Sequence, residues 1–164
     1  MELVLVRHGV AEDAGPGTGW RDEPRRLTPE GRTRMAAAAR GMASIGLRPD
    51  VVLTSPLVRC RETAEIVVAA VGGELHEDPR LRPGLEAGRL LEVLLEHPDA
   101  ARVLVCGHQP DMSEVAADLT GGSRVPFRKG GTAVIDVDTG RPGAALLVAV
   151  LPPRVLRALG DGAS

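Results

Sequence analysis

Short apolar runs alternate with stretches of helical periodicity along the first two thirds of the chain. Residues 3–6, 51–53 and 103–106 are runs of valine, leucine and one cysteine, as is typical of strands buried on both faces of a parallel sheet. Each run leads into a turn and then a helical pattern. Thr28-Pro29 and Ser55-Pro56 combine a capping hydroxyl with a proline at the first helical position, and Gln109-Pro110 marks a third start. This alternation predicts an α/β fold: a three-layer α/β/α sandwich around a mostly parallel, doubly wound sheet.

The helical patterns also predict which side chains face the core. Apolar residues recur at helical spacing after each start. They are Met35, Ala38, Ala39, Met42 and Ile45 in the first helix, Leu57, Cys60, Ala64, Val67 and Val71 in the second, and Met112, Val115, Ala116 and Leu119 in the third. Gly46, after the first set, is a plausible helix end.

The last third of the chain differs in pattern. Residues 133–137 and 145–151 flank the turn-rich segment 138–143, which predicts a hairpin and an antiparallel C-terminal edge on the sheet. Pro152-Pro153 begins a short final helix, and a frayed tail is expected from Gly160. No repeat or long linker divides the chain, so residues 1–164 are predicted to form a single domain.

Composition and charge exclude several classes of function. The 164 residues carry 20 basic and 22 acidic side chains, a net charge of -2, so neither nucleic acid nor a membrane is an expected partner. No apolar run approaches the ~20 residues of a membrane span, and no signal peptide is evident, which predicts a cytoplasmic protein. The two cysteines fit no disulfide framework. Only Lys129 departs from an otherwise all-arginine basic set, a bias that we attribute to coding composition.

Candidate chemistry gathers at the predicted carboxyl ends of strands, where ligands bind in open α/β sheets. Arg7-His8-Gly9 follows one run, Gly107-His108-Gln109 follows another, and Arg59 lies in the first turn of the second helix. Two imidazoles and two guanidinium groups therefore converge on one solvent-facing rim. A neutral imidazole is a competent nucleophile, and arginine forks bind phosphoryl oxygens. A protonated second imidazole and the helix start near Pro110 would add donors. The set suits phosphoryl transfer through a covalent phosphohistidine.

These residue types also occur in roles other than phosphoryl transfer. A histidine at a strand end is often structural, and His76 and His97 are interpreted in that way. Metal binding by His8 and His108 is disfavoured because no acidic residue or cysteine adjoins them at ligand spacing, so no metal and no other cofactor is expected. Ser55 lacks the Gly-x-Ser-x-Gly elbow of a serine hydrolase.

Three segments resemble the signatures of the histidine phosphatase (phosphoglycerate mutase-like) superfamily: residues 5–9, residues 54–64 with the pattern Ser-Pro-x-x-Arg-x-x-x-Thr-Ala, and residues 105–110. The resemblance spans about residues 1 to 157. Order, spacing and length are most similar to the short bacterial phosphohistidine phosphatases of the SixA type. The resemblance implies His8 as the nucleophile, Arg7, Arg59 and His108 as the phosphate pocket, and the Gln109 backbone N–H as a further phosphate contact.

The resemblance implies three further features. Arg25, in a run similar to Arg-x-Leu-Thr, would contact phosphate or substrate, with Arg26 as the alternative. Glu86 occupies the segment where larger relatives place a general acid, although a solvated loop carboxylate is the favoured interpretation. The substrate would be a phosphohistidine-bearing protein such as a phosphotransfer domain, bound at an open site that the glycine-rich loop 10–27 does not cover as a packed lid. The alternatives are small phosphate monoesters or a non-catalytic phosphate-binding module.

Overall fold

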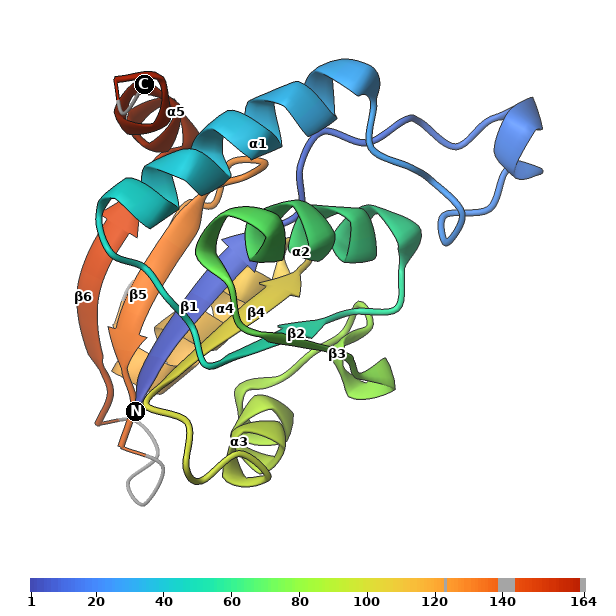
Figure 1. The fold of residues 1–164 in the computed structure, drawn as a ribbon. Coiled ribbons are helices and arrows are strands. Elements are labelled where there is room, and N and C mark those ends of the chain that lie inside the picture. The colour runs from blue at the N-terminus through green and yellow to red at the C-terminus, as the bar shows by residue number, and fades with distance from the viewer. Residues whose placement is uncertain (123, 139–143, 163–164) are drawn as a thin grey trace.

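The computed structural model describes residues 1–122, 124–138 and 144–162. In this part of the chain, six strands form one sheet in the order β3-β2-β4-β1-β5-β6 (Figure 1). The strands are β1 (Glu2–Arg7), β2 (Val51–Thr54), β3 (Glu74–Glu77), β4 (Arg102–Gly107), β5 (Thr132–Asp136) and β6 (Leu146–Leu151). The helices are α1 (Pro29–Ser44), α2 (Val58–Val71), α3 (Ala87–Leu95), α4 (Asp111–Thr120) and α5 (Pro153–Asp161), with short 3-10 turns at Pro16–Thr18 and Pro79–Leu81.

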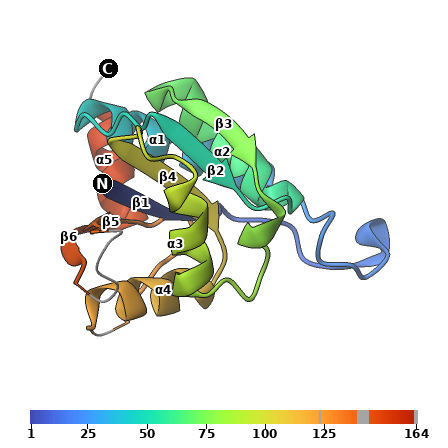
Figure 2. The same ribbon diagram turned by 90° about the horizontal axis from the view of Figure 1, so that it is seen from below.

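The sheet is mixed and covered by helices on both faces. Strands β1 to β4 are parallel, whereas β5 pairs antiparallel with β1 and β6 pairs antiparallel with β5. Helices α1, α2 and α5 cover one face and α3 and α4 the other (Figures 1 and 2). The predicted three-layer α/β architecture with an antiparallel C-terminal hairpin is therefore confirmed. The hairpin's turn lies largely outside the described residues.

Alternation along β1 divides the core into two layers. Leu3 and Leu5 pack under α3 and α4, while Val4 and Val6 pack under α1, α2 and α5. The predicted inward positions of the helices are buried, with one exception. Ile45 is 43% exposed, because α1 ends at Ser44 and Gly46 then takes a left-handed conformation that turns the chain away.

The two predicted hydroxyl caps behave differently. The Thr28 Oγ1 accepts a hydrogen bond from the Gly31 N–H at 2.9 Å and caps α1 as expected. The prediction for Ser55 was wrong, because α2 begins at Val58 with Leu57 as its N-cap residue. The Ser55 hydroxyl instead serves the candidate active site, described below.

The frayed tail predicted from Gly160 was also wrong for residues 160 and 161, while residues 163–164 lie outside the described part of the chain. Helix α5 continues to Asp161, and Gly160 is buried against α1. A Cβ atom at Gly160 would lie 2.1 Å from the Ala37 carbonyl oxygen, and one at Gly41 would lie 1.8 Å from the Leu156 carbonyl oxygen. The glycine that resembled a helix end is thus required for close packing of α5 on α1.

Among the described residues, no helix is long and apolar enough to cross a membrane.

Candidate active site

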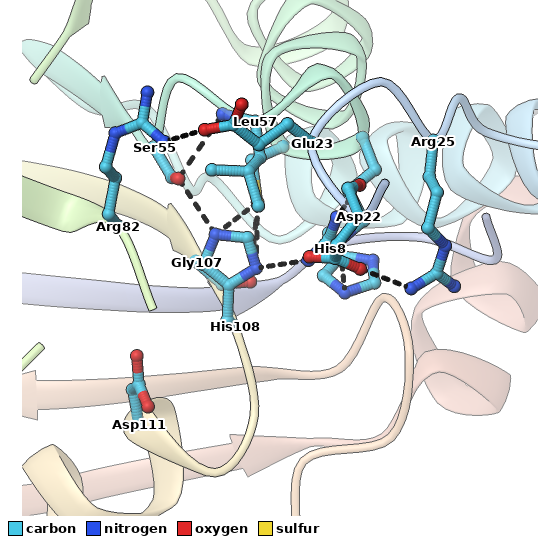
Figure 3. Close-up of polar contacts among 12 residues, drawn as sticks. His8, Asp22, Glu23, Arg25, Ser55, Leu57, Arg82, Gly107, His108 and Asp111 are labelled. Carbon is cyan, nitrogen blue, oxygen red and sulfur yellow. Dashed lines mark hydrogen bonds and ion pairs between the residues drawn. The ribbon is translucent and has the colours of Figure 1, made fainter. Parts of the chain in front are cut away.

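The carboxyl ends of three neighbouring strands bring the predicted site residues together. Arg7 and Gly107 are register partners at the ends of β1 and β4, so His8 and His108 follow side by side. Their ring centroids are 5.7 Å apart. Strand β2 lies on the other side of β4, and the helix that follows it supplies Arg59. The convergence predicted from the motifs is therefore seen for His8, His108 and Arg59, and Figure 3 shows the two imidazole rings side by side.

Arg59 connects the two imidazole rings. Its Nε donates to His8 Nε2 at 3.3 Å, and its Nη2 lies 3.3 Å from His108 Nδ1. The Arg59 side chain is only 6% exposed. Its backbone is fixed by Thr63, whose hydroxyl donates to the Arg59 carbonyl at 2.7 Å. A buried guanidinium group held between two imidazoles can bind a phosphoryl group that reaches either ring.

The hydrogen bonds of His8 assign its tautomer. The Nδ1 atom lies 2.7 Å from the Gly9 carbonyl oxygen, which can only accept, so Nδ1 carries the proton. The Nε2 atom then presents a lone pair toward Arg59. The Gly9 N–H donates to the Thr63 hydroxyl at 3.0 Å and holds this loop in place. The nucleophilic nitrogen of His8 is therefore Nε2.

His108 carries its proton on the other ring nitrogen, Nε2. Because Arg59 donates to its Nδ1, the proton lies on Nε2, which donates to the Ser55 hydroxyl at 2.8 Å. The Cys60 thiol lies 3.5 Å from the same ring. Burial raises the pKa of Cys60 to about 12, so this thiol remains protonated and does not compete with His8 as a nucleophile.

Both imidazoles are uncharged at neutral pH. Burial, together with the positive charges of Arg59 and Arg7, lowers the pKa of His8 to about 3, against the opposing effect of the Gly9 hydrogen bond. Burial and the Arg59 charge lower the pKa of His108 to about 4. His8 is only 7% exposed, so the expected solvent-facing position is wrong. Arginine, and not an imidazolium, supplies the positive charge of this site.

A carboxylate from the loop after β1 also reaches the site. The Asp22 Oδ2 accepts from Arg59 Nη2 at 2.8 Å, and the Asp22 backbone carbonyl accepts from Arg59 Nη1 at 3.0 Å. Burial alone would raise the pKa of Asp22, but hydrogen bonds from Arg25 and Arg59 hold it below the usual value. The ionised Asp22 carboxylate thus accepts from an Arg59 N–H group that a phosphoryl group would also need. The loop makes closer contact with the site than its glycines suggested.

Arg25 and Arg26 point to different partners. Arg25 Nη1 donates to Asp22 at 2.7 Å (Figure 3), so its link to the site runs through that carboxylate. Arg26 Nε donates to Glu62 at 2.9 Å. A direct phosphate contact by either arginine stays a prediction.

The remaining predicted residues lie at the margins of the site. Arg7 Nη1 donates to the Phe127 carbonyl oxygen at 2.8 Å, on the β5 side of His8. Gln109, just before α4, donates from Nε2 to the hydroxyl of Ser113 in that helix at 2.7 Å. Glu86 is exposed at the N-cap position of α3.

Sequence reasoning missed three contributors to the site. Thr63 and Ser55 both lie within the second motif, so their position near Arg59 in the sequence could have indicated a role in the site. No sequence pattern indicated Asp22, because nothing in the sequence of a glycine-rich loop fixes the point at which the chain folds back.

No group of three or more histidine, cysteine, aspartate or glutamate side chains suited to a metal ion occurs among the described residues. Metal independence itself stays a prediction.

The chain is similar to known proteins in sequence and in fold. Residues 3–83 match the model of the histidine phosphatase superfamily (branch 1). An uncharacterized protein of Picosynechococcus sp. is 40% identical over 129 residues, covering 74% of each chain. The structure of the protein histidine phosphatase SixA complexed with tungstate is 25% identical, with a TM-score of 0.84, covering 95% of this chain and 99% of that one. The alpha-ribazole phosphatase of Shigella flexneri is 20% identical, with a TM-score of 0.69 over 93% and 97% of the two chains, which shows the fold alone.

One guanidinium group between two neutral imidazoles suits the transfer of a phosphoryl group. The chain belongs to the histidine phosphatase superfamily and is a phosphatase of that class.

Proposed function

We propose that this phosphatase removes phosphate from phosphohistidine residues of other proteins through a covalent phospho-His8 intermediate. The observation that carries the proposal is the pair of neutral imidazoles bridged by Arg59, with the Nε2 lone pair of His8 directed at the guanidinium group. The likeness to SixA over nearly the whole chain supports phosphohistidine as the substrate.

The first step transfers the phosphoryl group from one imidazole to another. His8 Nε2 attacks phosphorus, and the bond from phosphorus to the substrate nitrogen breaks. When the substrate ring carries a proton on its other nitrogen, it leaves as a neutral imidazole. His8 becomes a phosphoimidazolium that keeps its own Nδ1 proton, held by the Gly9 carbonyl oxygen. Arg59 stabilises the charge on the phosphoryl oxygens in transit.

The second step returns the enzyme to its starting form. Water attacks the phosphorus of phospho-His8, the bond from phosphorus to Nε2 breaks, and dihydrogen phosphate leaves. Both protons of the water depart with the phosphate, so His8 is again neutral with its proton on Nδ1. The cycle thus needs no change in the protonation of His8.

The carboxylates near the site favour this substrate over alkyl esters. Asp22 is ionised because its pKa is lowered, and Glu86 is exposed at the start of α3. A sugar alkoxide needs a proton from a general acid in order to leave, whereas a protonated phosphoimidazole does not. The site is therefore better matched to a phosphoramidate than to a phosphate ester.

A comparison of substrates tests the proposal. We expect kcat/KM for a phosphohistidine protein, such as a phosphotransfer helix bundle, to exceed that for sugar phosphates by at least about a hundredfold, equivalent to ~2.7 kcal/mol. Comparable values for any common sugar or nucleotide phosphate would favour a phosphatase of small monoesters. Phosphate binding without turnover of any substrate would favour a binding module.

A further inference from the structure

A basic cavity of about 900 Å³ lies beside the candidate active site, on the side of β5 and β6. It opens where β1 and β6 end and β5 begins, because Arg7, Leu151 and Thr132 all line it. Six of the chain's basic side chains line the cavity, and no acidic residue is among its described lining residues. The six are Arg7, Arg34, Arg128, Lys129, Arg154 and Arg157.

These cations gather in a protein whose net charge is -2, so they do not reflect a generally basic surface. They come from four segments: β1, α1, the loop before β5, and α5. Arg34 pairs with Glu30 one turn earlier in α1. The other five form no ion pair within the described part of the chain. The only lysine of the sequence, Lys129, is one of them. Clustered cations without countercharges repel one another, and an anion from outside relieves that repulsion.

The cavity is physically connected to His8. The Gly130 N–H, in the loop that carries Arg128 and Lys129, donates to the Arg7 and His8 carbonyl oxygens at 3.0 and 3.2 Å. Arg7 itself lines the cavity, while its charge contributes to lowering the pKa of His8. An anion seated in the cavity would therefore lie close to the reacting phosphoryl group.

Arg7 is incompletely satisfied in this structure. Its Nε is buried without a hydrogen-bond partner among the described residues, and so is the Thr132 hydroxyl in the same wall. Burial lowers the pKa of Arg7, with no carboxylate acting in the opposite direction. A partly buried cation of this kind gains from a ligand that brings negative charge.

We propose that the cavity is a docking subsite for acidic side chains of the phosphohistidine-bearing protein, next to its phosphoryl group. The proposal rests on the proposed function and deepens it. Arg128, Lys129 and Arg154 are exposed around the cavity. A single phosphate could contact only a few of the six cations, whereas a protein face carrying several carboxylates contacts them together. The subsite selects phosphoproteins in which acidic residues surround the phosphohistidine.

The kinetic test uses two forms of one phosphotransfer helix bundle, phosphorylated chemically on histidine. One form has glutamates around the phosphohistidine, and the other has glutamines at the same positions. The wild-type enzyme should prefer the acidic form at least tenfold in kcat/KM at low salt. In the Arg154→Gln/Arg157→Gln enzyme, the ratio of the two values should fall toward one. The matched control is Arg48→Gln/Arg89→Gln, two exposed arginines outside the cavity, which should keep the preference.

Because each enzyme is compared on two substrates, a general loss of activity does not affect the ratio. A wild-type ratio near one, or a ratio retained by Arg154→Gln/Arg157→Gln, would overturn the proposal. So would inorganic tripolyphosphate binding at micromolar concentration through Arg154 and Arg157 while the acidic bundle does not bind, since the cavity would then hold a small polyanion.

Binding separates this proposal from the proposed function. Fluorescence anisotropy with the labelled, unphosphorylated acidic bundle should show binding that weakens at least tenfold in Arg154→Gln/Arg157→Gln and not in the control. If the enzyme hydrolyses neither phosphorylated bundle but does hydrolyse p-nitrophenyl phosphate, the proposed function fails. The binding result then tests the docking subsite by itself. Equal binding by the wild type, Arg154→Gln/Arg157→Gln and the control variant would overturn the proposed subsite.

Discussion

The carboxylate of Asp22 should compete with the phosphoryl group for Arg59. It accepts from Arg59 Nη2 at 2.8 Å, and a phosphoryl oxygen would use the same donor. Replacing Asp22 by alanine removes the competitor and leaves both imidazoles in place. We therefore expect phosphate analogues to bind more tightly to Asp22→Ala than to the wild type.

The size of the effect follows from the exposure of the two partners. The Arg59 side chain is 6% exposed, but that of Asp22 is 53% exposed, so solvent screens much of the attraction. A charge-assisted hydrogen bond contributes about 1.5–3 kcal/mol when well protected. Discounted for screening, the pair is worth about 1 kcal/mol, or roughly fivefold in an inhibition constant.

The assay is inhibition of phosphatase activity by vanadate or tungstate. Asp13→Ala is the matched control, because it removes the same charge from the same loop. Asp13 is fully exposed, and its carboxylate approaches Arg25 only at 4.0 Å. The inhibition constant should fall about fivefold in Asp22→Ala and change little in Asp13→Ala. A constant that is unchanged or higher in Asp22→Ala would refute competition and show instead that Asp22 positions Arg59 for catalysis.

Four further predictions concern the catalytic groups. His8→Ala should abolish turnover and the acid-labile phosphoenzyme, and substantial remaining activity would contradict the mechanism. EDTA should not reduce the rate, whereas a loss that Mg²⁺ or Zn²⁺ restores would reveal a metal requirement. Arg59→Lys keeps the charge but loses the guanidinium fork that reaches both rings, so kcat/KM should fall by the equivalent of roughly 2–3 kcal/mol. A near-normal kcat/KM would contradict the role of Arg59 in binding the phosphoryl group. The lowered pKa values of His8 and His108, about 3 and about 4, mean that the unfolded chain binds protons below pH 6.5 that the folded protein does not. Stability should therefore fall as the pH drops from 7.5 to 5, by about 2 kcal/mol per histidine. Denaturant unfolding of His8→Asn/His108→Asn should show a weaker fall, and an equal one would assign the pH dependence to other groups.

The layers of the fold could be predicted because they depend on local patterns. Two-sided burial makes residues 3–6 and 103–106 continuous apolar runs, which indicate central parallel strands. Motifs at the ends of such strands must converge, since parallel strands end at one edge of the sheet. The meeting of His8 and His108 follows from this rule, and Arg59 joins them because it lies in the first turn of the helix that follows β2.

Other features depend on contacts that no local pattern encodes. A serine before proline resembles a helix cap, but the Ser55 hydroxyl bonds to His108, 53 residues away. Gly160 resembles a helix end, but it is a packing surface for α1. In both cases a distant partner overrides the local meaning of the residue. The same limit applies to Asp22, whose position depends on the path of a whole loop.

The sequence predicts a protonated second imidazole as an additional donor, but His108 is neutral in the free protein. The pKa of His108 is low because its ring is buried and Arg59 lies beside it. A phosphoryl dianion placed on Arg59 would offset that positive charge and favour the protonated ring. The pKa of His108 should therefore be higher with a phosphoryl group on Arg59 than in the free protein. Any positive charge that His108 gains would thus appear only once the phosphoryl group is bound, and not in the free enzyme.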